Sequence, residues 1–373
     1  MGFTEEELQQ LQMENLQIDK AFVVPLEHRP KQQQQPPADD IPIIDLAPIA
    51  RNDAIGLAKV VDEMGRAAEQ WGFFQIVNHG VPLSLLDELE TVATKFFHLP
   101  VHEKRRMQRS LQNPLGYYDG ELTQNVRDWK EVFDFASGGK LELPAYSEPD
   151  RDEVDIYENK WPANPPEFRT VCEKWGAAVN LLAHQLLELL SQSLGLPADC
   201  LTTHFQNHMS FMRLNYYPKC PNPDLVLGVS RHKDVGALTV LVQDDVGGLE
   251  VRRKDGEWIR VTPHRDAFVI NVGDLFQGLR SELLVIDEVW SNDKYHSVEH
   301  RVVVNAQKDR LSFPLFFNPY HNTNIAPMPE LIDGQHPPKY RSFNYGKYFK
   351  KKGDGNYKDI GKDLQISDYA IEY

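Results

Sequence analysis

The chain changes its pattern at Pro197, and this change limits the folds that it can adopt. Before it, residues 168–194 carry apolar side chains on more than one helical face, which predicts a long buried helix, the spine helix. After it, short β-rich runs alternate with Gly, Pro, Asn and Asp. These runs cover residues 210–217, 238–242, 249–253, 258–261, 267–272, 300–304 and 311–317. Several short strands at close spacing predict a sandwich or jelly roll.

The region before the spine helix mixes two patterns. IPIIDL at 41–46 and residues 73–77 are β-rich, whereas 53–70 and 83–97 carry apolar residues at helical spacing. We therefore expect an α+β fold that is mainly β, with a jelly-roll core, a helical N-terminal region and a long spine helix.

The predicted organisation has five parts. They are a flexible segment at 1–40 that ends in the low-complexity stretch KQQQQPPADD, an N-terminal region at 41–145, a linker with the spine helix at 146–205, the jelly roll at 206–320 and a polar, basic wrapping tail at 321–373. Order should begin at Ile41. The acidic, proline-rich stretch at 140–166 is predicted to be an exposed crossing segment.

Charge and composition exclude several classes of partner. Forty Lys and Arg against fifty-five Asp and Glu give a net charge of −15, which argues against nucleic acid or an anionic membrane as a partner. The three cysteines, Cys172, Cys200 and Cys220, are too few and too scattered for a disulfide framework. No secretory signal and no run of about 20 apolar residues occurs. We expect a monomeric cytoplasmic protein that acts on a small molecule.

One of the thirteen histidines, His232, stands out by its position and by the aspartate two residues after it. His232 and Asp234 lie between two apolar strand patterns, and residues two apart in an extended chain project to the same side. His300 opens another β-rich run and supplies a third candidate ligand. Two imidazoles and one carboxylate are the facial set that leaves coordination positions open on Fe(II). Taken alone, the His-x-Asp spacing often arises by chance.

A candidate carboxylate clamp follows ten residues after His300. In a predicted strand, Arg310 could hold a carboxylate through a bidentate pair, and Ser312 could add a hydroxyl donor. Tyr217 is predicted to lie beside the same strands. The alternative is an ordinary exposed strand pair with a core tyrosine.

Together these motifs resemble one family. LNYYPKC at 214–220, HKD at 232–234, SxxHRV at 297–302 and RLS at 310–312 are similar to the plant branch of the 2-oxoglutarate-dependent Fe(II) dioxygenases, which includes flavonoid, gibberellin and other hormone oxidases. IPIIDL and EQWGFFQIVNHGVP at 69–82 resemble the N-terminal region of that family. The similarity covers about residues 41–345.

The resemblance implies a fold, a site and a reaction. The fold would be a double-stranded β-helix, with His232, Asp234 and His300 as iron ligands. Arg310 and Ser312 would hold the distal carboxylate of 2-oxoglutarate, joined by Tyr217, with Asn215 beside the co-substrate. The enzyme would consume O2, use ascorbate as reductant, release succinate and CO2, and oxidise, most often hydroxylate, a substrate C–H bond. Desaturation and demethylation are variants of the same chemistry. No catalytic side chain beyond the iron centre is expected.

Alignment with the family also suggests residues that line the substrate pocket. They are Phe133, Phe135, Tyr117, Tyr118, Arg213, Phe316 and Asn318. So many aromatic side chains suit a phenylpropanoid-like molecule and an apolar hormone skeleton equally well. Arg213 could pair with a substrate carboxylate, or could form an ordinary salt bridge within the protein.

The sequence departs from the family between Gln277 and Trp290. Relatives usually run directly from GDxxQ into xxSN, whereas this chain inserts GLRSELLVIDEV at 278–289, which places His300 66 positions after Asp234 (300 − 234). The insertion is more apolar than a tolerated surface loop. It could be a substrate-contacting lid, an alternatively spliced segment or an error of gene prediction, and we favour the last two.

Three rival functions are open. The first is an Fe(II) oxidase that does not use 2-oxoglutarate, of the ethylene-forming 1-aminocyclopropane-1-carboxylate oxidase type. The second is a catalytically impaired variant with a binding role, because the insertion blocks the site. The third, a zinc hydrolase, is disfavoured because the Arg310 and Ser312 clamp would have no purpose.

Overall fold

The computed structural model describes most of the chain. The described residues are 18–30, 41–110, 112–148, 151–276, 279–281, 284–286, 289–291, 294–333, 337–353, 366–369 and 371. Within them, no helix combines the length and the apolar character that a membrane span requires.

An eight-stranded sheet, here the major sheet, forms one wall of the molecule. Its order is β1-β2-β14-β11-β18-β9-β6-β3. The strands are β1 (Ile43–Asp45), β2 (Phe73–Val77), β3 (Gly116–Tyr118), β6 (Glu131–Ala136), β9 (Phe211–Tyr217), β11 (Leu238–Gln243), β14 (Phe268–Val272) and β18 (Arg310–Phe317). Only the β1–β2 pair is parallel; the other pairs in this sheet are antiparallel.

A four-stranded minor sheet completes the jelly roll. Its order is β10-β17-β12-β13, with β10 at Val229–His232, β12 at Leu249–Arg252, β13 at Trp258–Arg260 and β17 at His300–Val302. Strand β10 pairs with β17, and His232 lies opposite His300 in this pairing. The register shifts between Val229 and His232, which marks a bulge in β10. The predicted double-stranded β-helix with its helical N-terminal region is confirmed.

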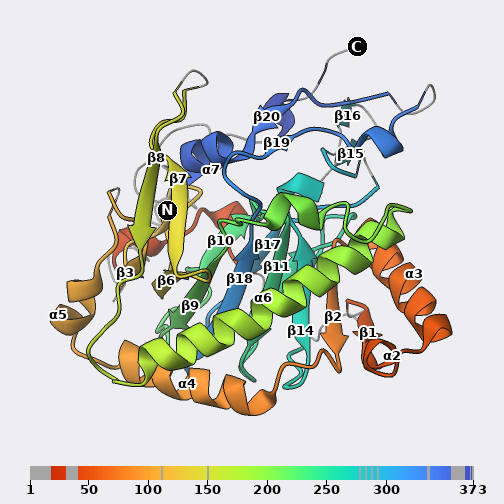
Figure 1. Ribbon diagram of the computed structural model, residues 1–373. Coiled ribbons are helices and arrows are strands. Elements are labelled where there is room, and N and C mark those ends of the chain that lie inside the picture. Colours follow the sequence, from red (N-terminus) through yellow and green to blue (C-terminus); the bar gives the residue numbers. More distant parts are fainter. Residues whose placement is uncertain are drawn as a thin grey trace, which may run out of the picture.

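Helices cover the outer face of the major sheet. Figure 1 shows the spine helix α6 (Phe168–Ser193) crossing this face, with α4 (Leu83–Phe97) and α3 (Ala54–Gln70) beside it. Trp175 and Leu186 of α6 are fully buried in the main hydrophobic core between the helices and the sheet. The spine helix predicted at 168–194 is therefore confirmed to within one residue. Its apolar side chains face both the sheet and the flanking helices, which explains why its pattern was not confined to one face.

The remaining elements are short. They are η1 (Lys20–Phe22), η2 (Leu26–His28), α2 (Ala47–Ala50), α5 (Val101–Lys104), η3 (Arg105–Met107), η4 (Thr202–Phe205), η5 (Asp274–Phe276), η6 (Pro329–Leu331), α7 (Tyr345–Gly353) and η8 (Ile366–Tyr369), with the strand pairs β4 (Leu122–Thr123) and β5 (Val126–Arg127), β7 (Lys140–Pro144) and β8 (Val154–Glu158), β15 (Leu279–Ser281) and β16 (Leu284–Ile286), and β19 (Asn324–Ile325) and β20 (Phe343–Asn344).

Gly72 allows the N-terminal region to approach the loop that precedes His300. Its φ is +65°, and a side-chain Cβ at this position would lie 2.0 Å from the His296 carbonyl oxygen. The His296 amide also donates a hydrogen bond to the carbonyl oxygen of Ala68 at the end of α3 (3.2 Å). Helix α3, which ends two residues before this glycine, therefore helps to place the His300 strand.

Two expectations about the chain outside the jelly roll were wrong. Order begins before Ile41, because residues 18–30 pack against the minor sheet: Ile18 and Val24 are buried, and the Phe22 ring contacts Trp129 edge to face. These few apolar residues have no regular spacing, so no periodic pattern indicated that they would pack. The second is the stretch at 140–166, where β7 and β8 form a hairpin instead of a crossing segment. Residues 31–40 lie outside the described residues.

The insertion at 278–289 folds back on itself. Strands β15 and β16 pair antiparallel, with Leu279 opposite Ile286, and neither belongs to the major or the minor sheet. Immediately after it, Trp290 is buried, its ring stacks on His204, and its amide donates to the Leu275 carbonyl oxygen (3.1 Å). The chain is thus anchored on both sides of a hairpin that adds no strand to the jelly roll.

Candidate active site

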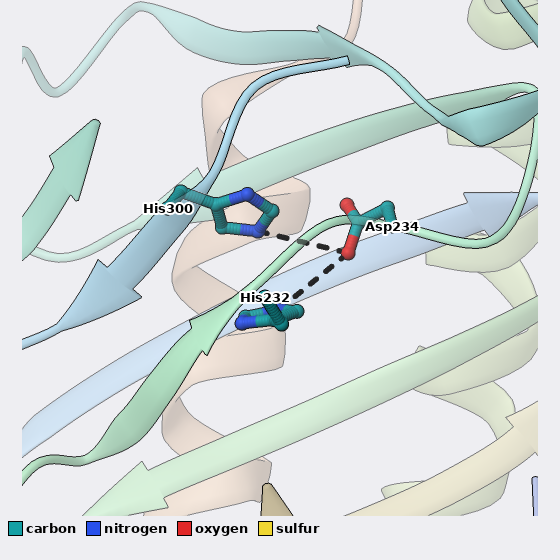
Figure 2. Close-up of side chains that lie close together, drawn as sticks. All are labelled: His232, Asp234 and His300. Atoms are coloured by element: carbon teal, nitrogen blue, oxygen red, sulfur yellow. Dashed lines mark ion pairs between the residues drawn. The ribbon is translucent and has the colours of Figure 1, made fainter. Parts of the chain in front are cut away.

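Three candidate metal ligands converge at the open end of the minor sheet. His232 ends β10, His300 begins β17, and Asp234 lies in the turn that leads into β11. The two imidazole Nε2 atoms each lie 3.6 Å from the same oxygen, Asp234 Oδ1. Figure 2 marks these two ion pairs with dashed lines. One ligand atom from each residue can be chosen so that all three lie within 4.8 Å of one another. The HxD spacing and the β10–β17 register together produce this cluster.

Hydrogen bonds fix the orientation of each candidate ligand. His232 Nδ1 lies 2.9 Å from the Ser230 carbonyl oxygen, and His300 Nδ1 lies 3.2 Å from the Val298 carbonyl oxygen. Each Nδ1–H therefore donates to the backbone, which leaves both Nε2 lone pairs directed at the space beside Asp234. Backbone bonds of this kind are typical of metal-binding histidines.

Asp234 is held through its second oxygen. Thr239 Oγ1 and Asn271 Nδ2 donate to Asp234 Oδ2 at 2.6 and 2.9 Å, so Oδ1 alone faces the imidazoles. Burial would raise the pKa of Asp234, but the two imidazoles and these hydrogen bonds hold it below its ordinary value. Burial and the neighbouring His300 lower the pKa of His232. At neutral pH the cluster is thus one carboxylate with a neutral imidazole at His232, the protonation state that a metal requires.

The candidate carboxylate clamp lies on paired strands. In the β9–β18 pairing, Arg310 is opposite Tyr217 and Ser312 is opposite Asn215, so the four side chains lie in two adjacent cross-strand pairs. The Arg310 guanidinium lies over the Tyr217 ring, 4.8 Å from its centroid. A Cβ on Gly228 would lie 2.7 Å from this ring, so only glycine leaves room for it.

The clamp has unused hydrogen-bonding capacity. Arg310 Nη1 donates to Ser312 Oγ (3.3 Å) and Nη2 donates to Gln243 Oε1 (3.0 Å), but no carboxylate pairs with Arg310 among the described residues. Arg310 Nε and Asn215 Oδ1 are buried and have no hydrogen-bond partner in that part of the chain. A buried, unpaired guanidinium is costly. The free donor, Arg310 Nε, fits a bound carboxylate that is not part of the protein, whereas Asn215 Oδ1 is an acceptor and needs a donor as its partner.

A cavity of about 450 Å³ opens beside the three candidate ligands. His232 and Asp234 line it, together with residues of β9, β10, β18, the β4–β5 hairpin and helix α7. Three of the residues expected to face the substrate, Arg213, Phe316 and Asn318, do line this cavity.

The other four expected pocket residues do not line the cavity, and that expectation was wrong. Phe133 and Phe135 are fully buried in the main core, where both pack near Trp161. Tyr117 lies opposite Phe133 on β3 and donates its hydroxyl to Glu131 (2.8 Å). Tyr118 is half-buried beneath the Arg109 guanidinium. Strand alternation is the reason: the face of β6 that carries both phenylalanines is the one that the spine helix covers.

Arg213 belongs to a buried ionic cluster that borders the cavity. The cluster consists of Arg109, Lys130, Arg213, Glu121, Asp128 and Asp134. Arg213 Nε donates to Asp134 Oδ1 (2.7 Å) and Nη1 donates to Glu121 Oε2 (2.9 Å). The salt-bridge alternative for Arg213 therefore holds in the structure, although the side chain also faces the cavity.

Several residues of the site were not predicted from the sequence. Thr239, Gln243 and Asn271 hold the candidate ligands and the clamp. The sequence did contain an indication for two of them, because Thr239 and Gln243 are polar residues four apart on one face of an otherwise apolar strand. Phe349 and Lys352 of α7 also line the cavity. No pattern in the polar C-terminal stretch indicated that it would return to the site.

Comparison with known proteins agrees with this geometry. Residues 208–319 match the model of the 2OG-Fe(II) oxygenase superfamily, and residues 41–164 match the model described as non-haem dioxygenase in morphine synthesis N-terminal.

Similar proteins match along most of their length. Jasmonate-induced oxygenase 2 of Arabidopsis thaliana is 36% identical over 333 residues, which cover 88% of this chain and 83% of that protein. Oxoglutarate-dependent flavonoid 7-O-demethylase 1 of Ocimum basilicum is 34% identical over 318 residues, 84% of this chain and 78% of that protein. The crystal structure of JOX2 in complex with 2OG, Fe and JA aligns with a TM-score of 0.72 at 34% identity and covers 94% of this chain and 93% of that chain.

The motifs, the fold and the site therefore agree with these matches. The chain belongs to the 2OG-Fe(II) oxygenase superfamily and is a 2-oxoglutarate-dependent dioxygenase, an oxidoreductase that uses Fe(II) and 2-oxoglutarate.

Proposed function

We propose that His232, Asp234 and His300 bind Fe(II) and that Arg310 and Ser312 bind the distal carboxylate of 2-oxoglutarate. The observation that carries the metal assignment is the position of both Nε2 atoms 3.6 Å from one carboxylate oxygen. Two imidazoles and a carboxylate are the donor set of non-haem Fe(II) oxygenases. The unpartnered Arg310 Nε supports the clamp, and we place Tyr217 and Asn215 beside the same co-substrate.

Each side chain has a defined task in this proposal. When bound, Fe(II) and 2-oxoglutarate supply O2 activation, with release of succinate and CO2 and oxidation of a substrate C–H bond. Asp234 contributes a single oxygen because Thr239 and Asn271 occupy the other. Arg310 fixes the co-substrate by a planar pair of N–H donors. The buried strands around these residues restrict access of water to the reaction.

We propose a small aromatic or hormone-like plant metabolite as the substrate, with hydroxylation as the reaction. Phe211, Phe316 and Phe349 line the cavity and offer apolar faces to a flat or alicyclic molecule. Among the relatives, a flavonoid 7-O-demethylase acts on a flavonoid and JOX2 was crystallised with JA. Arg213 is already paired with two carboxylates, so the cavity presents less positive charge than its arginine suggests.

A metabolite screen with succinate as the readout tests this function. The purified chain is supplied with Fe(II), 2-oxoglutarate and ascorbate and is presented with flavonoids and with hormone-like carboxylic acids. Succinate formed in proportion to an oxidised product is expected. Substrate oxidation without succinate would favour the ethylene-forming type of oxidase. Iron binding with no turnover of any co-substrate would favour the catalytically impaired variant. The monomeric state and the cytoplasmic location remain predictions; size-exclusion chromatography tests the first.

Removing residues 278–289 should improve the enzyme. Strands β15 and β16 of this segment pair only with each other among the described residues, so its loss removes an apolar hairpin and shortens the connection to His300. The deletion also removes Val289, which is buried in the main core. We expect a melting temperature higher by about 1–2 °C, which corresponds to about 1 kcal/mol because the entropy of unfolding grows with chain length, and a higher rate of succinate formation. A deletion variant that is both less stable and less active would contradict this prediction. Unchanged iron binding with an altered substrate range would identify a lid.

Gln124→Gly should stabilise the β4–β5 hairpin. Gln124 and Asn125 form its two-residue turn with φ of +54° and +60°, a conformation that asparagine tolerates and glutamine does not. Relief of about 1–2 kcal/mol of backbone strain, partly offset by the greater chain entropy of glycine, should raise the free energy of unfolding by about 0.5–1 kcal/mol. Thermal unfolding measures it. Asn52→Gly, with φ +52° at a surface turn, is the matched control and should change little.

A further inference from the structure

The β4–β5 hairpin contacts both the cavity and the strand that carries His232. Residues 121–125 line the cavity beside the candidate ligands. Residues 128–130, which follow the hairpin, run along the chain before β10, where the Trp129 amide donates to the Leu227 carbonyl oxygen (2.9 Å). This segment therefore joins the cavity wall to β10.

Asp128 connects the hairpin segment directly to strand β10 through a hydrogen bond. Its carboxylate is buried, and Oδ1 accepts a hydrogen bond from the Ser230 amide at 3.2 Å. Ser230 lies where the β10–β17 register shifts, so it lies outside the regular ladder pairs of this sheet. Asp128 thus supplies the hydrogen bond that Ser230 N–H needs at the bulge.

The carbonyl group of Ser230 forms a second hydrogen bond, with the His232 ring. It accepts the Nδ1–H of His232 at 2.9 Å, and this bond directs His232 Nε2 toward Asp234. A single residue, Ser230, is therefore held by Asp128 through its amide and orients His232 through its carbonyl.

Thr123 and Lys130 fix Asp128 itself. Thr123 Oγ1, in β4, donates to Asp128 Oδ2 (2.7 Å), and Lys130 Nζ lies 3.0 Å from the same oxygen. These bonds leave Oδ1 for the Ser230 amide. The arrangement runs from the hairpin through Asp128 and Ser230 to His232.

We propose that Asp128 is a positioning residue for His232, and that the β4–β5 hairpin sets the orientation of this metal ligand while it lines the substrate cavity. The proposal rests on the proposed role of His232 in binding iron. Under this proposal, Asp128 does more than neutralise the charge of Lys130. Partners of metal-binding histidines typically change metal affinity tenfold to a hundredfold when they are removed.

Metal affinity in a set of variants tests the proposal. Co(II) is the probe, because its visible d–d spectrum reports coordination geometry without reaction with O2. Asp128→Ala in the full chain should raise the Kd for Co(II) about tenfold or more and shift the spectrum. Asp128→Asn keeps an acceptor for the Ser230 amide and should restore the Kd to within about threefold of the parent.

Asp134→Ala is the matched control. Asp134 is an equally buried carboxylate of the same ionic cluster, but it forms ion pairs with Arg109 and Arg213, neither of which lies on β10. It should lower the melting temperature and leave the Co(II) Kd and spectrum unchanged. Equal weakening in Asp128→Ala and Asp134→Ala would reduce the effect to general destabilisation and overturn the proposal, as would an unchanged Kd in Asp128→Ala.

A further variant covers the case in which Asp128→Ala does not fold. Asp128→Glu keeps the charge beside Lys130 but moves the acceptor, so it should weaken Co(II) binding about tenfold while Asp128→Asn does not. Equal affinities in these two variants would overturn the positioning role. If the parent itself binds no Co(II), the proposed metal site fails, which is a separate result from a failure of the Asp128 link.

Discussion

His232→Ala is expected to abolish succinate formation. Within the part of the chain that the structure describes, the substitution leaves Asp234 and His300 as the only candidate ligands, and two donors cannot maintain the facial set that leaves positions open for 2-oxoglutarate and O2. Because loss of a partner that only supports a ligand already costs tenfold to a hundredfold in metal affinity, loss of the ligand itself should cost more than a hundredfold. Iron affinity by anaerobic titration and succinate yield with saturating 2-oxoglutarate measure the two effects.

His102→Ala provides the control for this variant. His102 is an exposed histidine near Glu103, and its loss should leave both iron affinity and succinate yield at the parent level. Asp234→Ala should behave like His232→Ala. Undiminished succinate in either ligand variant, with His102→Ala also active, would remove the metal assignment.

Arg310→Lys should raise the concentration of 2-oxoglutarate that the enzyme needs by about tenfold to a hundredfold. Lysine keeps the positive charge but loses the planar pair of donors, and it cannot reproduce the guanidinium contact over the Tyr217 ring. A lost charge-assisted hydrogen bond is worth about 1.5–3 kcal/mol, which corresponds to this range. Iron binding in the absence of 2-oxoglutarate should be retained, since Arg310 lies on β18 and none of the three candidate ligands does.

The steady-state KM for 2-oxoglutarate is the decisive measurement. Arg265→Lys is the matched control, because it replaces a guanidinium that already pairs with two carboxylates, Asp87 and Glu90, on the surface and away from the candidate clamp. Its KM should stay within about twofold of the parent. If Arg310→Lys gave the same KM as Arg265→Lys, the carboxylate clamp would have to lie elsewhere.

The sequence was sufficient for the cluster of candidate ligands, for a physical reason. His232 and Asp234 are close along the chain, and the apolar runs around them and around His300 indicated strands. The pairing of β10 with β17, which places His232 opposite His300, was not predicted from these patterns; the family resemblance linked the two histidines. The reasoning from spacing held for Arg310 and Ser312, which are two apart on one strand and so share a face.

The sequence was insufficient wherever the answer depended on which face of a strand is covered. Phe133 and Asp134 alternate on β6, and either could have faced the cavity; the spine helix decides the matter by packing on the phenylalanine side. A shift of one residue exchanges the two faces. The contribution of α7 to the cavity depends on tertiary packing, which no local pattern in a polar, basic stretch can reveal.

The pairing of His232 with His300 has a consequence for how the protein comes to be folded. The two imidazoles are brought together only when β10 and β17 join across an interval of 68 residues (300 − 232). An unfolded chain therefore offers no preformed site, so iron at the proposed site would bind the native state in preference to the unfolded chain. Metal binding then adds to the free energy of folding by mass action, about 2.7 kcal/mol at a metal concentration one hundred times Kd. Such distant pairing also forms late, because loop closure must precede it. Iron bound at the proposed site would thus stabilise the folded jelly roll in addition to its part in the reaction.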